Sequence, residues 1–200
     1  MIHRTPQENK KDEIEQFIYS FLGDESFKIE IVSLKCLENY KTSKTTTEVK
    51  LRTNLESTLV KCKGEGSGVL HSLFTCLKEL YAGQYRSLTG INLNSFSVTT
   101  NLCTAASFDR TDAMVEVVSE FKNAAGAITP FRASSSSLMG SAASSILSAV
   151  QFYINSEKTF LRLRDLIDDA ESRNRSDLKG ELVYKITKII GVSSYEGLVR

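Results

Sequence analysis

The sequence has no tryptophan, two prolines and only two histidines, His3 and His71. No apolar run approaches the roughly 20 residues that a helix needs to cross a bilayer, and residues 1–9 lack the pattern of a signal peptide. We therefore expect a cytoplasmic protein without a membrane segment. Basic and acidic residues nearly balance, 25 against 24, so charge gives no reason to expect binding to nucleic acid or to a membrane surface.

Cysteine is also scarce, and Cys36, Cys62, Cys76 and Cys103 are separated by 26, 14 and 27 positions. The sequence has no CxxC pair, and two histidines add no zinc-ligand pattern. We predict that all four cysteines are reduced thiols packed as small core residues. No metal and no cofactor is expected.

What the chain does have is an ordinary globular composition. It is 41% hydrophobic and 24% charged. Its 200 residues suit one large domain, or one medium domain with extensions.

Glycine is concentrated in one stretch that organises the sequence. Gly64, Gly66 and Gly68 fall within five residues, GEGSG, and this arrangement permits a sharp turn. In the following residues, 69–81, leucines and aromatic side chains repeat at helical spacing. Upstream, residues 58–63 alternate between apolar and polar, as a half-buried strand does. The unit is a strand, a glycine turn and a helix.

Two further strands precede this unit. Residues 27–37 begin as a strand whose apolar phase slips at Val32, which a β-bulge would accommodate. Residues 39–43 are turn-like, and residues 45–53 alternate again. Asn54 offers a short hairpin turn into the third strand. The first half of the chain therefore predicts a βββα unit.

The same order returns in the second half. Strands are predicted at residues 91–98, 112–122 and 127–134, followed by a helix over residues 137–155. Pro130 cannot donate to a ladder, so its strand is expected at a sheet edge or with a bulge. The sequence predicts an α+β fold in which two tandem βββα units form a pseudo-twofold domain.

Helices are predicted at both ends of the chain. Thr5, Pro6 and Glu8 are typical of a capped helix start. That helix either packs on the next domain or is the tail of a connection from a domain missing here. Two helices after residue 156, the second starting at Ser176, are expected to form a hairpin over the body; the alternative is a partner-binding tail.

These expectations divide the chain into an N-terminal helix and linker, 1–26, a βββα-βββα domain, 27–156, and a helical extension, 157–200. The helix over residues 137–155 is rich in glycine, alanine and serine. We expect this small-residue face to pack closely on another helix, within the chain or across a dimer axis.

Residue chemistry gives little sign of catalysis. The glycine turn suggests a phosphate site, but the P-loop lysine is missing and residues 91–101 contain no acid to hold a ribose. A structural turn is the better interpretation. His71 is expected on the helix surface or partly buried, and Cys76 lies about 140° away from it around the helix, too far for a nucleophile–base pair. The acids between residues 165 and 171 form a solvated face. We therefore assign no catalytic residue.

Several stretches, taken in order, resemble one known family. They are residues 47–57, GEGSG with Leu73 and Leu77, and residues 88–98, 112–121 and 135–150. Together they are similar to the C-terminal regulatory, or dimerisation, domain of 2-isopropylmalate synthase and of its relatives, citramalate synthase and homocitrate synthase-like enzymes. The resemblance covers residues 27–155. The chain departs from it at Val69, where the family often has proline, and at Ser95 and Phe96, which stand at an aspartate–tyrosine pair.

The resemblance implies a fold of two βββα units that binds an end-product amino acid, leucine or isoleucine, in a pocket at a homodimer interface. It also implies coupling to a catalytic TIM barrel with a His-x-His metal motif, which these 200 residues do not contain. This chain alone is therefore not expected to be an enzyme. It would be the regulatory part of an acetyl-CoA-condensing acyltransferase, or would work beside one.

By position, the resemblance suggests ligand contacts from both units and backbone N–H groups from the glycine turn for a ligand carboxylate. The candidate ligand residues are Leu70, Leu73, Leu77, Phe96, Val98, Ala133 and Ser135, and the turn residues are Gly64, Gly66 and Gly68. Core packing is the alternative role for each. Two other functions stay open: an interaction or scaffold module that kept the fold without the ligand, and an independent enzyme.

Overall fold

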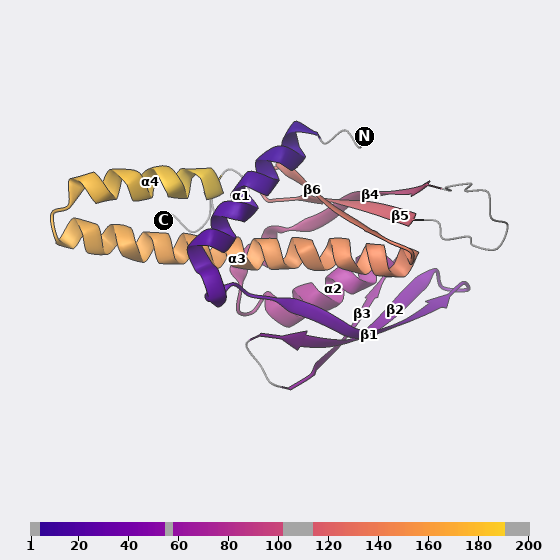
Figure 1. Cartoon of the computed structure of the whole chain (residues 1–200). Coiled ribbons are helices and arrows are strands. Elements are labelled where there is room, and N and C mark those ends of the chain that lie inside the picture. Colours follow the sequence, from indigo (N-terminus) through magenta and orange to yellow (C-terminus); the bar gives the residue numbers. More distant parts are fainter. Residues whose placement is uncertain (1–4, 55–57, 102–113, 191–200) are drawn as a thin grey trace.

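Figure 1 shows the computed structural model, which describes residues 5–54, 58–101 and 114–190. Within these residues the chain is α+β, with four α-helices and two three-stranded antiparallel sheets. The first sheet has the order β1 (Ile29–Asn39), β2 (Lys44–Thr53), β3 (Val60–Gly66). The second has the order β4 (Asn92–Asn101), β5 (Met114–Lys122), β6 (Ile128–Ser135).

The first sheet follows the predicted alternation. Along β2, Thr47, Val49 and Leu51 are buried while the residues between them are exposed. The register of β1 on β2 shifts between Ile31 and Ser33, which confirms the phase slip predicted at Val32. The hairpin turn predicted after Asn54 falls on residues 55–57, outside the described residues. Asn54 itself accepts a hydrogen bond from the Lys28 N–H and donates one to the Ser26 carbonyl.

The predicted end of the third strand at Lys63 is wrong. Gly64 and Gly66 belong to β3, where they pair with Thr47 and Thr45 of β2. β2 continues to Lys44, and its backbone groups there need partners. The strand therefore extends through the glycines, and the chain turns only at Ser67 and Gly68.

The second sheet repeats several features of the first. Its first strand, β4, also has a register shift, between Leu93 and Ser95. β6, which carries Pro130, lies at the edge of the sheet, as predicted. The strand predicted from residue 112 is described from Met114 onward.

Two helices fill the space between the sheets. In Figure 1, α2 (Val69–Tyr81) and α3 (Leu138–Ser172) lie between the two sheets, with α2 against β2 and β3 and α3 against β5 and β6. One apolar core joins all these layers; it includes Leu51, Leu77, Phe121, Ile146 and Val150. α3 contacts α2 and α1, and two of its small residues, Ser141 and Ser145, also bond the middle strand β5. The Ser141 hydroxyl donates to the Val115 carbonyl, and Ser145 bonds Ser119.

The predicted end of this helix at residue 155 is also wrong, because α3 is one continuous helix of 35 residues. The polar residues that suggest a break are buried and have partners. Ser156 and Thr159 donate to helix carbonyls one turn back. Glu157 accepts from the backbone N–H groups of Arg86 and Ser87 in the short 3-10 helix η2 (Arg86–Gly90).

The terminal helices contact each other. α1 (Pro6–Leu22) begins with the predicted capping box of Thr5 and Glu8 and packs on the body through Ile14 and Ile18, so the first of its two predicted roles holds. The short 3-10 helix η1 (Gly23–Glu25) follows it. α4 (Ser176–Ile190) returns along the C-terminal half of α3. This hairpin extends away from the sheets, whereas we predicted that it folds over them (Figure 1).

The hairpin has a small apolar cluster of its own. Leu163 and Ala170 of α3 meet Leu182 and Ile189 of α4 there, and α1 contributes Phe17 and Phe21. None of the helices in the described ranges combines the length and apolar character that crossing a bilayer would require.

Candidate functional site

A hollow of about 530 Å³ lies between the start of α2 and strand β4. Its walls come from the residues that follow β3 and from the first half of β4: Ser67, Gly68, Val69, Leu70, His71, Leu93, Asn94, Ser95 and Phe96. Three of the predicted residues, Gly68, Leu70 and Phe96, are among them. The hollow thus joins the last part of the glycine stretch to the second sheet.

The α2 wall presents an open helix N-terminus. Gly68 is the N-cap residue, and no side chain caps the helix there. The first intrahelical bond runs from the Ser72 N–H to the Gly68 carbonyl, so the N–H groups of the residues before Ser72 have no acceptor within the helix. Backbone donors and the helix dipole favour an anion at such an end.

His71 stands beside these donors. The Ser67 N–H donates to His71 Nδ1 over 3.3 Å, and the Ser67 hydroxyl lies 3.2 Å from the same atom. Because Nδ1 accepts from a backbone N–H, the neutral ring carries its proton on Nε2. His71 is exposed, which confirms the predicted surface position.

β4 carries apolar side chains that are only partly covered. Phe96 pairs with Ser119 and Val98 pairs with Val117. Directly opposed residues share a face of the sheet, and both partners are fully buried beneath the helices. Phe96 and Val98 therefore lie on the core-facing side, yet they are 54% and 43% exposed. We call these two residues the β4 apolar strip.

Three polar groups on or next to β4 were missed from the sequence. The Ser95 hydroxyl donates to Glu120 over 2.5 Å. Asn94 stands at the register shift of β4. Lys78 donates from α2 to the Ile91 carbonyl over 2.8 Å, which ties α2 to the start of β4, and burial lowers the pKa of Lys78. The broken alternation of residues 92–96 was the only signal in the sequence.

The remaining predicted ligand residues do not line this hollow. Leu73 and Leu77 are fully buried in the core. Ala133 pairs with Val117 on β5. Ser135 bonds Ser141 and receives a hydrogen bond from the Ser137 N–H, so it organises the start of α3.

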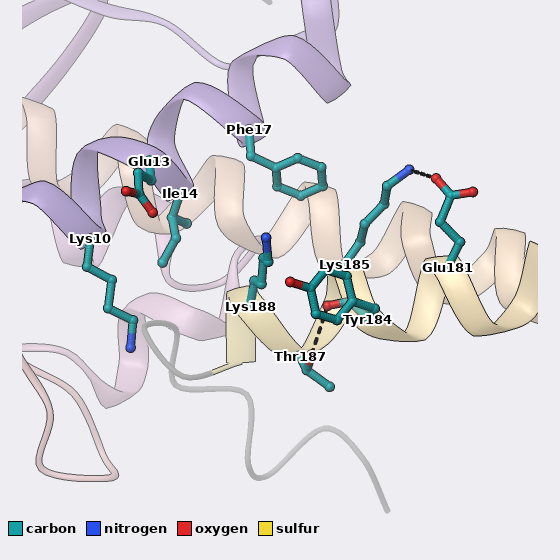
Figure 2. Close-up of a pocket in the computed structure, with 9 residues that line it drawn as sticks. All are labelled: Lys10, Glu13, Ile14, Phe17, Glu181, Tyr184, Lys185, Thr187 and Lys188. Atoms are coloured by element: carbon teal, nitrogen blue, oxygen red, sulfur yellow. Dashed lines mark hydrogen bonds and ion pairs between the residues drawn. The ribbon is translucent and has the colours of Figure 1, made fainter.

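A second hollow, of about 610 Å³, lies between α1 and α4 (Figure 2). We call it the α1–α4 groove; it is lined by Lys10, Glu13, Ile14, Phe17, Glu181, Tyr184, Lys185, Thr187 and Lys188. Ile14 is nearly buried, whereas Tyr184 is 63% exposed. Lys188 lies over the Tyr184 ring, with its Nζ 4.7 Å from the ring centre. No ligand residue was predicted here.

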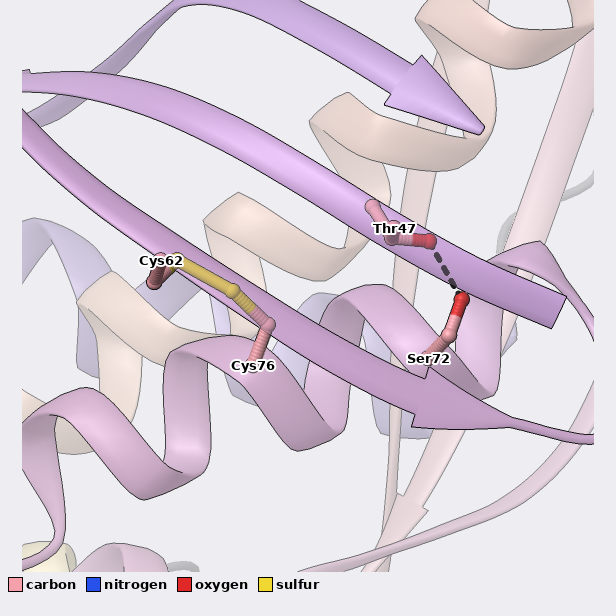
Figure 3. The surroundings of a disulfide bond; sticks show 4 residues. All are labelled: Thr47, Cys62, Ser72 and Cys76. Carbon is pink, nitrogen blue, oxygen red and sulfur yellow. Dashed lines mark hydrogen bonds between the residues drawn. A yellow bond between two sulfur atoms is a disulfide. The ribbon is translucent and has the colours of Figure 1, made fainter. Parts of the chain in front are cut away.

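The glycine stretch has a packing role as well. A Cβ atom built on Gly64 would lie 2.7 Å from Cys76 N and closer still to the Ser72 carbonyl, and one built on Gly66 would lie 2.6 Å from Ser72 N. Only glycine allows α2 to lie this close to β3. The Thr47 and Ser72 hydroxyls form a hydrogen bond at the same contact (Figure 3).

The close contact brings two cysteines together. Cys62 of β3 and Cys76 of α2 form a disulfide, with their Cα atoms 6.0 Å apart (Figure 3). The prediction of four reduced core thiols is therefore wrong for this pair. Cys36 is a free thiol but is exposed, which is also contrary to that prediction. Cys103 lies outside the described residues. The spacing of 14 positions carried no signal; only the folding of α2 back onto β3 explains the pairing.

Comparison with known sequences adds no assignment: no protein-family model matches the chain, and no curated protein matches it. Among residues 5–54, 58–101 and 114–190, no group of three or more His, Cys, Asp or Glu side chains could hold a metal ion. The function therefore has to be argued from the geometry of the hollow and of the two sheets.

Proposed function

We propose that this chain is a non-catalytic regulatory domain that binds a small branched-chain amino acid, leucine or isoleucine, as a feedback effector. The domain would be similar to the C-terminal domain of 2-isopropylmalate synthase or citramalate synthase. One observation carries the proposal: an uncapped helix N-terminus faces apolar side chains across the hollow between α2 and β4.

The chemistry of the hollow suits an aliphatic amino acid. Its carboxylate would accept from the free N–H groups at the start of α2. Its hydrocarbon side chain would lie against Leu70, Leu93 and Phe96. The side-chain oxygen of Asn94 is an acceptor for the ammonium group.

The repeated features of the two halves support the pseudo-twofold part of this proposal. Each half has three antiparallel strands in sequence order and then a helix, with a register shift near the start of its first strand. In each, the fourth residue of the helix is a serine whose hydroxyl bonds the middle strand, Ser72 to Thr47 and Ser141 to the Val115 carbonyl. A duplicated βββα unit accounts for all of these matches.

The β4 apolar strip supports a homodimer. Phe96 and Val98 lie on the core-facing side of an edge strand without being covered, and Phe96 lines the open hollow. A second copy seated on this strip would bury both side chains and close the site, which agrees with the interfacial pocket that the family resemblance implies. A cytoplasmic domain of this kind would regulate a catalytic barrel, in the same chain or in another subunit.

A thermal-shift screen with leucine, isoleucine and valine tests the effector. Millimolar leucine or isoleucine should raise the melting temperature, because a ligand that binds only the folded state stabilises it. Phe96→Ala should abolish the shift, whereas Leu138→Ala, at an exposed apolar residue that is not part of the hollow, should keep it. If none of the three amino acids raises the melting temperature, the effector role is wrong.

Light scattering coupled to size exclusion tests the dimer. The wild-type mass should be twice that of one chain, and Phe96→Lys should give a monomer because it would bury two charges at the interface. Tyr184→Lys, at another exposed ring, on α4, should remain a dimer. A monomeric wild type would contradict the dimer without excluding the effector.

The α1–α4 groove favours a second candidate function, an interaction module that keeps the fold without the ligand. Its floor of Ile14 and Phe17 is apolar. Lys10 and Lys188 line its sides, together with Glu13 and a Lys185–Glu181 ion pair. This combination fits an amphipathic helix with acidic flanks. Such a peptide should bind at low salt and lose affinity in the Tyr184→Ala variant. This function would gain support only if the amino-acid screen is negative and the peptide binds.

A further inference from the structure

The Cys62–Cys76 disulfide closes a ring around one wall of the hollow. The ring contains the residues from Ser67 to His71, which form the α2 wall. The opposite wall, from Leu93 to Phe96, lies outside it. A change in the conformation of this ring would therefore move the α2 wall of the hollow relative to the β4 wall.

The contact inside the ring leaves little room for adjustment. Gly64 and Gly66 bring the β3 backbone directly against Ser72 and Cys76, so even an added methyl group would collide. Bonded sulfurs are about 2.05 Å apart, whereas non-bonded heavy atoms need roughly 3.5 Å or more. Cys76 is 1% exposed and enclosed by the core, so its sulfur cannot simply swing into solvent. Breaking the bond removes the only covalent link between α2 and β3 within the described residues and leaves this tight contact to hydrogen bonds and packing.

The two cysteines differ in burial: Cys62 is partly exposed, whereas Cys76 is 1% exposed. Cys62 is half-buried and lies on β3, an edge strand of the first sheet, while Cys76 belongs to the buried core. A thiolate from solvent therefore attacks at Cys62. This asymmetry is typical of a disulfide that reacts in a fixed order.

We propose that Cys62 and Cys76 form a reversible thiol–disulfide site, with small thiols and disulfides as reactants, whose oxidised form holds the hollow in its binding shape. In reduction, the thiolate of a dithiol attacks Cys62 Sγ. A new S–S bond forms there, and the Cys62–Cys76 bond breaks. Cys76 leaves as a thiolate and takes up a proton. The second thiolate of the reductant then attacks the reductant sulfur in the mixed disulfide with Cys62. That S–S bond breaks, Cys62 leaves as a thiolate and takes up a proton, and the reductant leaves as a cyclic disulfide.

The second half of the chain provides an internal control. Counted from the helix start, Ser145 of α3 stands at the position of Cys76 in α2, and it bonds Ser119 without a covalent link. Reduction of the disulfide should therefore speed amide exchange in the first βββα segment and leave exchange in the second segment unchanged.

The test uses the full chain with Cys36→Ser and Cys103→Ser, so that only the pair remains. Mass spectrometry after alkylation should count no free thiols in oxidised glutathione and two in dithiothreitol, without denaturant. Amide exchange in residues 64–71 should become at least tenfold faster on reduction, while residues 133–140 change less than twofold. Cys62→Ser should reproduce the fast exchange in both buffers.

The proposal is overturned if the pair stays oxidised in dithiothreitol, or if exchange in residues 64–71 does not respond to reduction. The ligand measurement rests on the proposed function: the oxidised chain should bind leucine or isoleucine at least tenfold more tightly than the reduced chain. Equal affinities would overturn the link to the hollow. If neither form binds while the exchange still responds, the effector role fails and the redox site stands.

Discussion

At the residue scale, Gly64 shows how one missing Cβ decides where a helix lies. It is buried, paired within β3, and in contact with Ser72 and Cys76 of α2. The glycine cluster predicted a turn, and the turn is present at Ser67 and Gly68. The sequence pattern could not reveal that Gly64 and Gly66 serve close packing, because that role depends on where α2 comes to rest.

Gly64→Ala should destabilise the fold by about 1–3 kcal/mol, the usual cost of forcing an extra carbon into a packed contact. Gly180→Ala is the matched control, since Gly180 lies in α4 with nothing within 4 Å of an added Cβ. That change should stabilise the chain by up to about 1 kcal/mol through helix propensity. Urea unfolding of both variants measures the contrast, and a neutral Gly64→Ala would contradict the close contact.

A partly buried ion-pair network joins α1 to the second sheet. Arg132 of β6 donates to Glu8 over 2.7 Å and also pairs with Glu116 of β5. Burial by itself would raise the pKa of Glu8, but hydrogen bonds from the Thr5 N–H and from Arg132 outweigh it, so the pKa lies below the usual 4.5. The stabilisation by this carboxylate is therefore full above pH 4.5 and is lost as the pH falls through the lowered value.

Glu8→Gln should lower the free energy of unfolding by about 1–3 kcal/mol at pH 7, because Arg132 loses a charged partner in a largely buried place. The difference from wild type should shrink between pH 7 and pH 3, because the native carboxyl takes up protons as the pH falls toward its lowered pKa. Urea unfolding at both pH values measures the difference in unfolding free energy between the variant and the wild type. Glu13→Gln, on the exposed side of α1, is the control. An equal difference at both pH values would show that packing alone is responsible.

At the scale of elements, Glu157 explains why α3 passes through a stretch that predicts a break. The side chain is 4% exposed and accepts from two backbone N–H groups of η2, at 3.1 Å and 2.9 Å. A buried carboxylate in this position satisfies the start of η2 and keeps the helix in contact with the body. The partner lies 70 residues upstream, so local sequence could not predict it.

Glu157→Ala should destabilise the chain by about 2–3 kcal/mol, because it leaves two buried donors without an acceptor. Glu157→Gln should cost less, since its amide oxygen still accepts one of the two bonds. Thermal unfolding ranks the variants against Glu79→Gln on the exposed face of α2. If the two Glu157 variants have equal stability, the hydrogen bonds to η2 do not account for the loss of stability in Glu157→Ala.

Local patterns predicted most of the elements but few of the contacts between them. The strands, the bulge at Val32, the edge position of Pro130 and the capping box at Thr5 all depend on near neighbours, and all are confirmed. The disulfide, the continuity of α3 and the direction of the hairpin depend on distant partners. For the same reason, only Gly68, Leu70 and Phe96 of the predicted site residues line the hollow.

At the scale of the whole molecule, the hairpin is anchored by its own apolar cluster and by α1. Leu182 of α4 is 5% exposed within that cluster, whereas Leu178 on the same helix is 39% exposed. Leu182→Ala should therefore destabilise the fold by about 2–4 kcal/mol, and Leu178→Ala by less than about 1 kcal/mol. Circular dichroism during thermal unfolding measures both. Equal melting temperatures would mean that α4 is not packed as described.

The unbroken course of α3 gives the molecule a lever. At about 1.5 Å per residue, its 35 residues span about 52 Å, from the second sheet to the tip of the hairpin. Rotating such a rod by about 5° at one end displaces the other end by roughly 4–5 Å. A small rotation of α3 beside Ser141 would thus move the hairpin tip, and any partner bound to it, by several ångströms. The helix has no break between Leu138 and Ser172 that could absorb the rotation.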